Sequence, residues 1–228
     1  NNDRKIELDP HPSGPLRVWH TPQESRRYVI SADIAEGIPD GAYSVADVLD
    51  ASTWEQVAQW RGHCTPLEFA DVLGDLGTYY NWGLIVPEVN NHGLATCGRL
   101  VDQGYSNLYT REQKTEGINY GWLTTAKSKI LMVNALSHAL KHMDCKINSE
   151  ATLDELKSFV YKDGRQEMTH QAGAFSDCVM SLGIGISILG EIRETPLTTR
   201  QRFKEALGLP RYRTSVQPQV AGYGTRKC

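Results

Sequence analysis

The hydrophobic and polar positions of this chain follow two periods, one typical of strands and one typical of helices. Residues 27–33 alternate and end at an aspartate, and residues 42–49 and 53–61 follow as two further strand-like runs. A Pro39-Asp-Gly turn signal separates the first two runs. The pattern therefore predicts a meander of three antiparallel strands joined by short turns.

A helix start follows this meander. Thr65 can cap a helix, Pro66 occupies its first position, and Glu68 completes a capping box. Residues 83–86 then form a short apolar run, which is predicted to be a buried strand parallel to the first because a helix connects the two. The predicted apolar side of the helix consists of Leu67, Phe69, Ala70, Leu73, Leu76 and Tyr80.

The rest of the chain is predicted to be mainly helical. The predicted elements are helices over residues 92–102 and 124–143, a short strand over residues 107–110, a short helix running into a strand over residues 153–160, a hairpin turn over residues 162–165 and an apolar helix over residues 175–193. The apolar positions of the longest helix are Ile130, Val133, Leu136, Leu140 and Met143. The order of elements predicts an α/β fold in which helices flank a mixed sheet, with the first strand at the centre beside the fourth.

Length and composition indicate a soluble globular protein. The 228 residues suffice for one domain with a substantial core, or at most two small domains. No apolar run approaches the ~18 residues of a membrane span, so no membrane contact is expected. Five widely spaced cysteines without a C-x-x-C pair argue against a disulfide framework or a zinc knuckle, and they fit a reducing cytoplasm.

Charge divides the chain unevenly. Residues 195–228 carry seven basic residues and one acidic residue, a net charge of +6, whereas the remainder carries −9. This basic tail, which includes Arg200 and Arg202, either contacts a polyanion or an acidic surface, or is simply solvated. Residues 1–26 are polar and rich in proline, and we interpret them as a linker or arm. Residues 27–194 then form the folded domain.

Three carboxylates occupy positions where a metal ion could use them. Asp33 and Glu88 end apolar runs that are predicted to be buried strands, and Asp177 opens an apolar helix. Clustered carboxylates repel one another unless a cation joins them, and hard oxygen ligands suit Mg²⁺ or Mn²⁺. Simpler interpretations remain for each residue: a turn for Asp33, loop surface for Glu88, and a favourable helix dipole for Asp177.

The order of elements and the three acids resemble the ribonuclease H-like superfamily. The closer resemblance is to the C-terminal nuclease domain of the large terminase subunit, the DNA-packaging motor of tailed bacteriophages. The matching stretches are residues 29–37 with 40–49, residues 86–93, residues 121–125 with 127–140, residues 153–156 and residues 175–182. The resemblance implies that Asp33, Glu88 and Asp177 are catalytic, metal-binding acids. The chain departs from the pattern at Ser176, where the family usually has a second aspartate.

This resemblance implies a metal-dependent endonuclease that cuts double-stranded DNA with little sequence preference. Two Mg²⁺ or Mn²⁺ ions ~3.5–4 Å apart would activate a water and stabilise the leaving 3′ oxygen. Lys127 and Lys129 are expected near the DNA, although solvated lysines are the simpler interpretation. Glu36 and His92 are weaker candidates for metal and phosphate contacts. The implied partners are the portal protein and the small terminase subunit, and the implied location is the procapsid in the host cytoplasm.

The chain lacks the G-x-x-x-x-G-K-[ST] phosphate loop. The ATPase domain of the full-length subunit is therefore expected to precede residue 1. Three alternatives remain at this stage. They are a Holliday-junction resolvase or ribonuclease H of the same fold, a catalytically weak module that binds DNA or the portal, and half of an actin-like sugar kinase.

Overall fold

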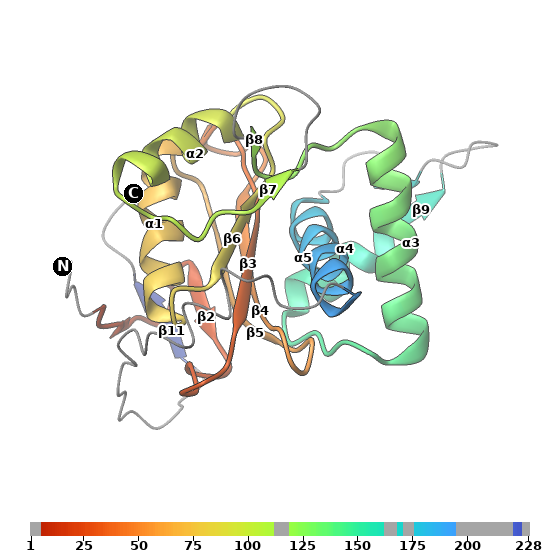
Figure 1. Cartoon of the computed structure of the whole chain (residues 1–228), viewed down its shortest axis with the longest axis horizontal. Helices are drawn as coiled ribbons and strands as arrows, with labels where there is room; N and C mark the ends of the chain where they lie inside the picture. Colours follow the sequence, from red (N-terminus) through yellow and green to blue (C-terminus); the bar gives the residue numbers. More distant parts are fainter. Residues whose placement is uncertain (1–5, 112–118, 162–167, 171–175, 195–220, 225–228) are drawn as a thin grey trace.

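A mixed β-sheet lies between two layers of helices (Figure 1). The computed structural model describes residues 6–111, 119–161, 168–170, 176–194 and 221–224. One face of the sheet is covered by α1 (Pro66–Tyr79) and α2 (Gly93–Asp102), and the other by α4 (Glu150–Ser158) and α5 (Asp177–Glu194), with α3 (Ala126–His142) packed on the outer side of α5. None of the helices in the described part of the chain has the length and apolar character to cross a membrane.

The sheet has seven strands within the described residues. In spatial order they are β1 (Asp9–Pro10), β11 (Ala221–Gly224), β2 (Leu16–Val18), β5 (Gln56–Gly62), β4 (Ser44–Asp50), β3 (Tyr28–Asp33) and β6 (Leu84–Pro87). β3 pairs antiparallel with β4 and parallel with β6, so the predicted meander and the parallel fourth strand are both confirmed. The predicted central position of β3 is wrong, because β6 is the edge strand and β3 lies next to it.

The third strand of the meander begins later than the sequence pattern indicates. β5 starts at Gln56 because the preceding residues form a turn around Asp50. The Asp50 carboxylate accepts hydrogen bonds from the backbone N–H groups of Ser52 (2.7 Å) and Thr53 (3.3 Å). Trp54 then adopts a positive φ of 57°. Side-chain capping of a turn of this kind competes with strand pairing.

The prediction that residues 1–26 are an arm is wrong for residues 16–18. β2 pairs antiparallel with β5, and its Leu16 and Val18 side chains are buried. A three-residue strand bounded by prolines is too short to produce a periodic signal. The loop after β2 is also anchored, since the Tyr80 hydroxyl donates to the His20 carbonyl (2.9 Å). The sheet therefore begins before residue 27.

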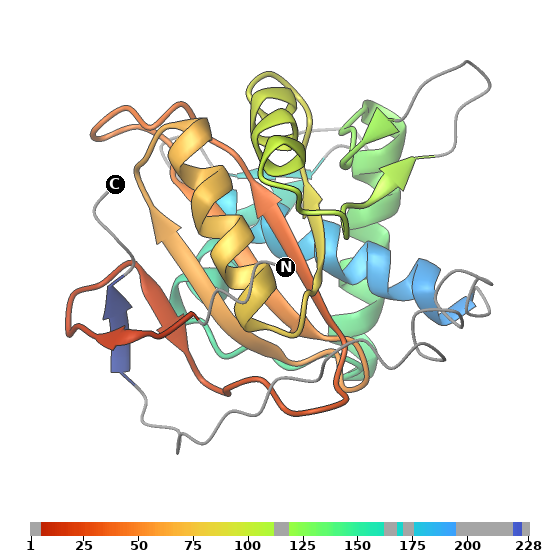
Figure 2. The ribbon, with the colours of Figure 1, turned by 60° about the vertical axis from the view of Figure 1, so that its left-hand side comes forward.

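The basic tail also contributes to the sheet. β11 pairs antiparallel with β2 and β1, which a solvated tail would not do (Figure 2). The other residues of the predicted tail, including Arg200 and Arg202, lie outside the described residues.

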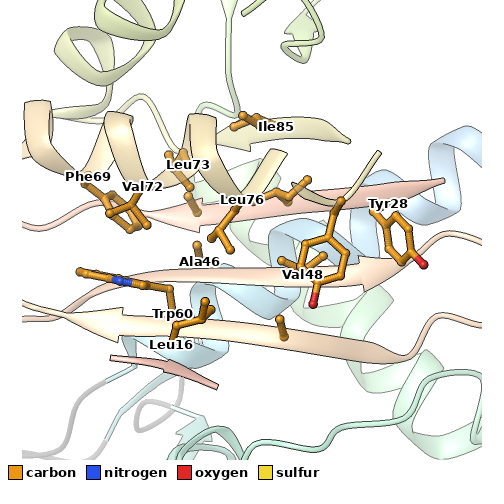
Figure 3. Close-up of a cluster of buried hydrophobic side chains, with 14 of the residues drawn as sticks. Leu16, Tyr28, Ala46, Val48, Trp60, Phe69, Val72, Leu73, Leu76 and Ile85 are labelled. Carbon is orange, nitrogen blue, oxygen red and sulfur yellow. The ribbon is translucent and has the colours of Figure 1, made fainter. Parts of the chain in front are cut away.

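The first helix begins as its sequence indicates. The Thr65 hydroxyl accepts a hydrogen bond from the Glu68 N–H, and the Glu68 carboxylate accepts one from the Thr65 N–H. Phe69, Leu73 and Leu76 then point from α1 onto the sheet (Figure 3). Leu67, which was predicted on the apolar side, is exposed.

The longest helix turns a different side to the core than predicted. α3 begins after Thr125, whose hydroxyl accepts a hydrogen bond from the Ser128 N–H (3.1 Å), and Val133 and Leu136 are buried as expected. Ile130 and Leu140 are exposed, however, and Met143 is 88% exposed. The buried side consists of Met132, Val133, Leu136 and Ala139. This narrow stripe suffices because α3 packs on α5 rather than on the sheet.

The remaining predictions are met in part. The helix-to-strand prediction over residues 153–160 corresponds to α4 and β9 (Phe159–Tyr161), which pairs antiparallel with β10 (Met168–His170). The turn predicted at residues 162–165 lies outside the described residues. The predicted strand over residues 107–110 is reduced to a single parallel bridge from Leu108 to Ile85. Beyond it, β7 (Thr110–Arg111) pairs with β8 (Asn119–Tyr120).

Gly185 lets α5 approach the sheet closely. α5 packs across β3 and β4, and the Ser181 hydroxyl donates to the Ser31 carbonyl (3.1 Å). A Cβ atom on Gly185 would lie 2.6 Å from both the Leu49 Cδ1 and the Ser31 Oγ atoms. This contact fixes the height of α5 above the sheet, and therefore the position of Asp177 at its start.

We expect Gly185→Ala to lower the free energy of unfolding by about 1–3 kcal/mol, because the added methyl group overpacks the helix–sheet contact. Gly190→Ala is the matched control in the same helix, where an added Cβ meets no atom within 4 Å. That change should raise the free energy of unfolding by up to about 1 kcal/mol, since alanine favours the helix. Urea unfolding of both variants measures the difference, and a stabilised Gly185→Ala variant would contradict the packing described.

Candidate active site

The sheet brings Asp33 and Glu88 together. Asp33 is the last residue of β3, and Glu88 follows β6, its parallel neighbour. The Glu88 N–H donates to the Ala32 carbonyl (2.8 Å), which extends the strand pairing to the position of the carboxylate. Because the carboxyl ends of parallel strands meet at one edge, both side chains leave the sheet side by side.

Asp177 reaches the same end of the sheet from α5. The Tyr43 backbone N–H donates to Asp177 Oδ2 at 2.7 Å, and Tyr43 precedes β4, the other neighbour of β3. Burial raises the pKa of Asp33 well above its usual value, and a hydrogen bond with Glu88 and the charges of Glu88 and Asp177 raise it further. The structure therefore brings together the three acids that the sequence singled out.

Asp33 interacts with both of the other acids, through a hydrogen bond and charge with Glu88 and through charge alone with Asp177. Among the residues that the structure describes, no group of three His, Cys, Asp or Glu side chains is arranged to hold a metal ion. The interaction between Asp33 and Glu88 is a side-chain hydrogen bond, which favours the protonated form of Asp33. Clustered carboxylates are stabilised by a hard cation, so the donor set fits Mg²⁺ or Mn²⁺.

Glu155 positions the start of α5. Its Oε2 atom accepts hydrogen bonds from the backbone N–H groups of Cys178 (2.8 Å) and Val179 (3.3 Å), beside Asp177. A carboxylate at a helix N-terminus satisfies free N–H groups and is favoured by the helix dipole. The sequence pattern marked residues 153–156 only as part of a resemblance. Nothing in the sequence distinguishes Glu155 from the neighbouring acids of this short helix, Glu150 and Asp154.

A buried polar network holds α4 against the sheet. Asp47 Oδ1, on β4, accepts hydrogen bonds from the side-chain amides of Gln56 (2.6 Å) and Gln59 (2.9 Å). The Gln59 amide also contacts the Thr152 hydroxyl (2.9 Å), and the Ser149 hydroxyl donates to Gln59 Oε1 (2.7 Å). The network therefore connects the sheet to the helix that carries Glu155. The sequence analysis missed the burial of Asp47. Strand alternation places Asp47 on the same face of β4 as Val45 and Leu49, which are both buried.

The loop after Glu88 is tied to the start of α3. The Asn90 side chain donates to the Thr124 carbonyl (2.8 Å) and accepts from the Thr124 N–H (3.0 Å). These bonds place the predicted DNA-contacting residues near the site: Lys127 is exposed and Lys129 is half-buried at the start of α3. The other two predicted contacts, Arg200 and Arg202, lie outside the described residues.

Two weaker candidates pair with each other. His92 Nε2 lies 3.0 Å from Glu36 Oε1, and both side chains are exposed at the surface. Neither contributes to the pKa of Asp33. Ser176 occupies the position where the resemblance leads us to expect a second aspartate. Its carbonyl oxygen accepts a hydrogen bond from the Met180 N–H (2.9 Å), the first backbone hydrogen bond of α5.

Asp47 makes stability depend on pH. Burial raises its pKa from 3.8 to about 6, and the nearby Glu155 charge adds to the shift. Because the folded state disfavours the charged form, its contribution is largest below pH 3.8 and is lost as the pH rises to about 6. Relative to Asp47→Asn, we expect the wild-type free energy of unfolding to fall by about 2–3 kcal/mol over this window. Urea unfolding at several pH values tests this, and a constant difference would refute it.

Glu155→Ala should lower the free energy of unfolding by about 1–3 kcal/mol, because the N–H groups of Cys178 and Val179 lose their acceptor. Asp154→Asn on the same helix is the control, since Asp154 is exposed and its carboxylate pairs with Lys157 (2.7 Å) on the surface of α4. Thermal unfolding of the two variants provides the comparison. Equal melting temperatures would show that Glu155 does not hold α5.

Comparison with known proteins identifies the fold. No family model and no curated protein matches the sequence. Three solved structures match with 24% sequence identity. Two of them are the large terminase nuclease of thermophilic phage G20c, with bound magnesium (TM-score 0.65) and with bound cobalt (TM-score 0.64). Each of these matches covers 80% of this chain and 92% of the phage G20c chain. The third is the large terminase nuclease domain of Thermus phage P74-26 (TM-score 0.62), and the match covers 79% of this chain and 88% of the P74-26 chain. The chain thus has the mixed-sheet fold of these large terminase nucleases.

Proposed function

We propose that this chain is the divalent-metal-dependent endonuclease domain of a phage DNA-packaging terminase. The observation that carries the proposal is the meeting of Asp33, Glu88 and Asp177 at one end of the sheet. The fold is shared with large terminase nucleases, one of which has been crystallised with magnesium, cobalt and zinc. Fold and acids together support a nuclease more strongly than either does alone.

The three acids would hold Mg²⁺ or Mn²⁺. When bound, a pair of such ions supplies an activated water for attack on phosphorus and stabilises the leaving 3′ oxygen. The chain's own part is to hold the acids in place. The ends of β3 and β6 fix Asp33 and Glu88, while the Tyr43 amide and the Glu155 carboxylate fix Asp177. Because the pKa of Asp33 is raised, protonation of this carboxyl group would compete with binding of a cation.

The proposed substrate is double-stranded DNA, bound through its backbone with little sequence preference. Lys127 and Lys129 support this choice, because the bonds between Asn90 and Thr124 hold their helix beside the Glu88 loop. In the full motor, an ATPase domain of the same chain would move the DNA. The portal protein and the small terminase subunit would be its partners at the procapsid, in the host cytoplasm.

One observation favours a second candidate function. Ser176 replaces the second aspartate that we expect from the resemblance, and the Asp33 and Glu88 side chains are hydrogen-bonded to each other. A module that binds DNA or the portal with little catalysis would tolerate both features. The two candidates differ in whether the chain cuts DNA at all.

Nicking of supercoiled plasmid in Mn²⁺ tests the proposal. We expect Asp33→Asn, Glu88→Gln and Asp177→Asn each to lower the nicking rate by at least about 100-fold, since each would remove a metal-binding oxygen. Asp154→Asn should cut like the wild type, because this acid lies on the exposed side of α4. Chelation of the metal should stop cutting.

Unchanged nicking in Asp33→Asn would rule out the assigned site, and a wild-type chain that never nicks DNA would favour the binding module. Faster cutting of four-way junctions or RNA–DNA hybrids than of linear duplex would favour a resolvase or a ribonuclease H instead.

A further inference from the structure

Arg61 lies in the same cross-strand row as Asp33. Asp33 of β3 is directly opposite Val45 of β4, and Val45 is directly opposite Arg61 of β5. Directly opposed residues of antiparallel strands point to the same face of a sheet. Arg61 therefore leaves the α5-covered face as Asp33 does, two strands and roughly 10 Å away.

The guanidinium of Arg61 is held in place by an aromatic stack. Arg61 Cζ lies 3.4 Å from the centroid of the Tyr43 ring. The His63 ring stacks on Tyr43 with a centroid separation of 4.1 Å and an interplanar angle of 19°. Residues 61 and 63 are about 7 Å apart along an extended strand, so the tyrosine ring fits between them. His63 Nε2 also lies 3.1 Å from the Gly41 carbonyl oxygen, which fixes the outer layer of the stack.

The stack is joined to the acidic site. The backbone N–H of Tyr43 donates to Asp177 Oδ2 (2.7 Å), so the residue whose ring supports Arg61 also contacts one of the three acids. Tyr43, Arg61 and His63 are each half-buried, which leaves this edge of the site open to a ligand.

Arg61 has donor capacity that the described residues do not use. Its Nε atom is buried without a hydrogen-bond partner in that part of the chain. Arg26 and Arg99, in contrast, pair with Asp50 and Asp71. Because Nε is buried, a ligand would reach Arg61 through the terminal amino groups of its half-buried side chain. A fixed guanidinium fork matches the geometry of phosphate oxygens.

We infer that Arg61 binds a backbone phosphate of duplex DNA next to the one that is cut. This inference rests on the proposed nuclease function and adds a DNA contact to it. In the strand order β6–β3–β4–β5, Arg61 and the start of α3 lie on opposite sides of Asp33. DNA would thus be held from two sides, by Arg61 on one and by Lys127 and Lys129 on the other. Such cationic contacts would offset the repulsion between DNA and the three acids.

Arg61→Gln tests this inference, with Arg99→Gln on α2 as the matched control. Binding of a fluorescein-labelled linear duplex to the whole chain is measured by anisotropy, with chelator present to prevent cutting and with salt varied. We expect Arg61→Gln to raise Kd about 5- to 20-fold and to reduce the slope of log Kd against log salt by about one. In Mn²⁺ it should raise the KM for plasmid and change kcat little. Arg99→Gln should leave all of these values unchanged.

Arg61→Lys is a second test variant, to be used if Arg61→Gln does not fold. The melting temperature of each variant shows whether it is folded. Lysine keeps the charge without the fork, so we expect a retained salt slope with a Kd raised about 2- to 5-fold. If Arg61→Gln does not fold, a lysine variant that binds like the wild type overturns the inference.

The possible outcomes separate this inference from the proposed function. If the wild type binds and cuts DNA but Arg61→Gln matches Arg99→Gln in Kd, salt slope and KM, the role of Arg61 is refuted and the nuclease proposal remains. If the wild type binds without cutting, the nuclease proposal fails and the Kd values alone decide the role of Arg61. If the wild type neither binds nor cuts duplex DNA, both fail.

Discussion

Electrostatic repulsion between acids at the ends of two parallel strands is the constraint on which this structure depends. Once β3 and β6 are paired in register, Asp33 and Glu88 cannot avoid each other. Burial then makes the charged form of Asp33 costly. Without a cation, the repulsion is relieved by the hydrogen bond between Asp33 and Glu88. In the proposed function, a bound cation offsets this repulsion.

The third acid depends on elements that are distant in sequence. Asp177 is placed by the close approach of α5 at Gly185, by the Tyr43 amide and by Glu155. Glu155 in turn depends on the polar network around Asp47, which holds α4 to the sheet. The site is therefore supported by both the backbone and a buried polar layer, so that stability and site geometry are physically connected.

Sequence patterns predicted the elements that carry their own local signals. The Thr65 cap, the three-strand meander and the parallel strand before Glu88 were recovered because turn residues, capping residues and apolar periodicity are local. The three acids were found because each ends or begins an apolar run. β2 was missed because three residues have no period, and the exposed side of α3 was misjudged because its partner is another helix. Arg61, Tyr43 and Glu155 act through contacts that only the tertiary structure creates.

Tyr43 serves two neighbours through different parts of itself. Its main-chain amide contacts Asp177, whereas its ring supports Arg61. Replacing the side chain therefore leaves the donor to the acid in place, while exchanging one flat ring for another preserves the platform beneath the guanidinium. In the proposed function, substitution at this one residue could therefore change the affinity for DNA while leaving the placement of the acid unaltered, which is a simple evolutionary route to a tighter or weaker hold on the substrate.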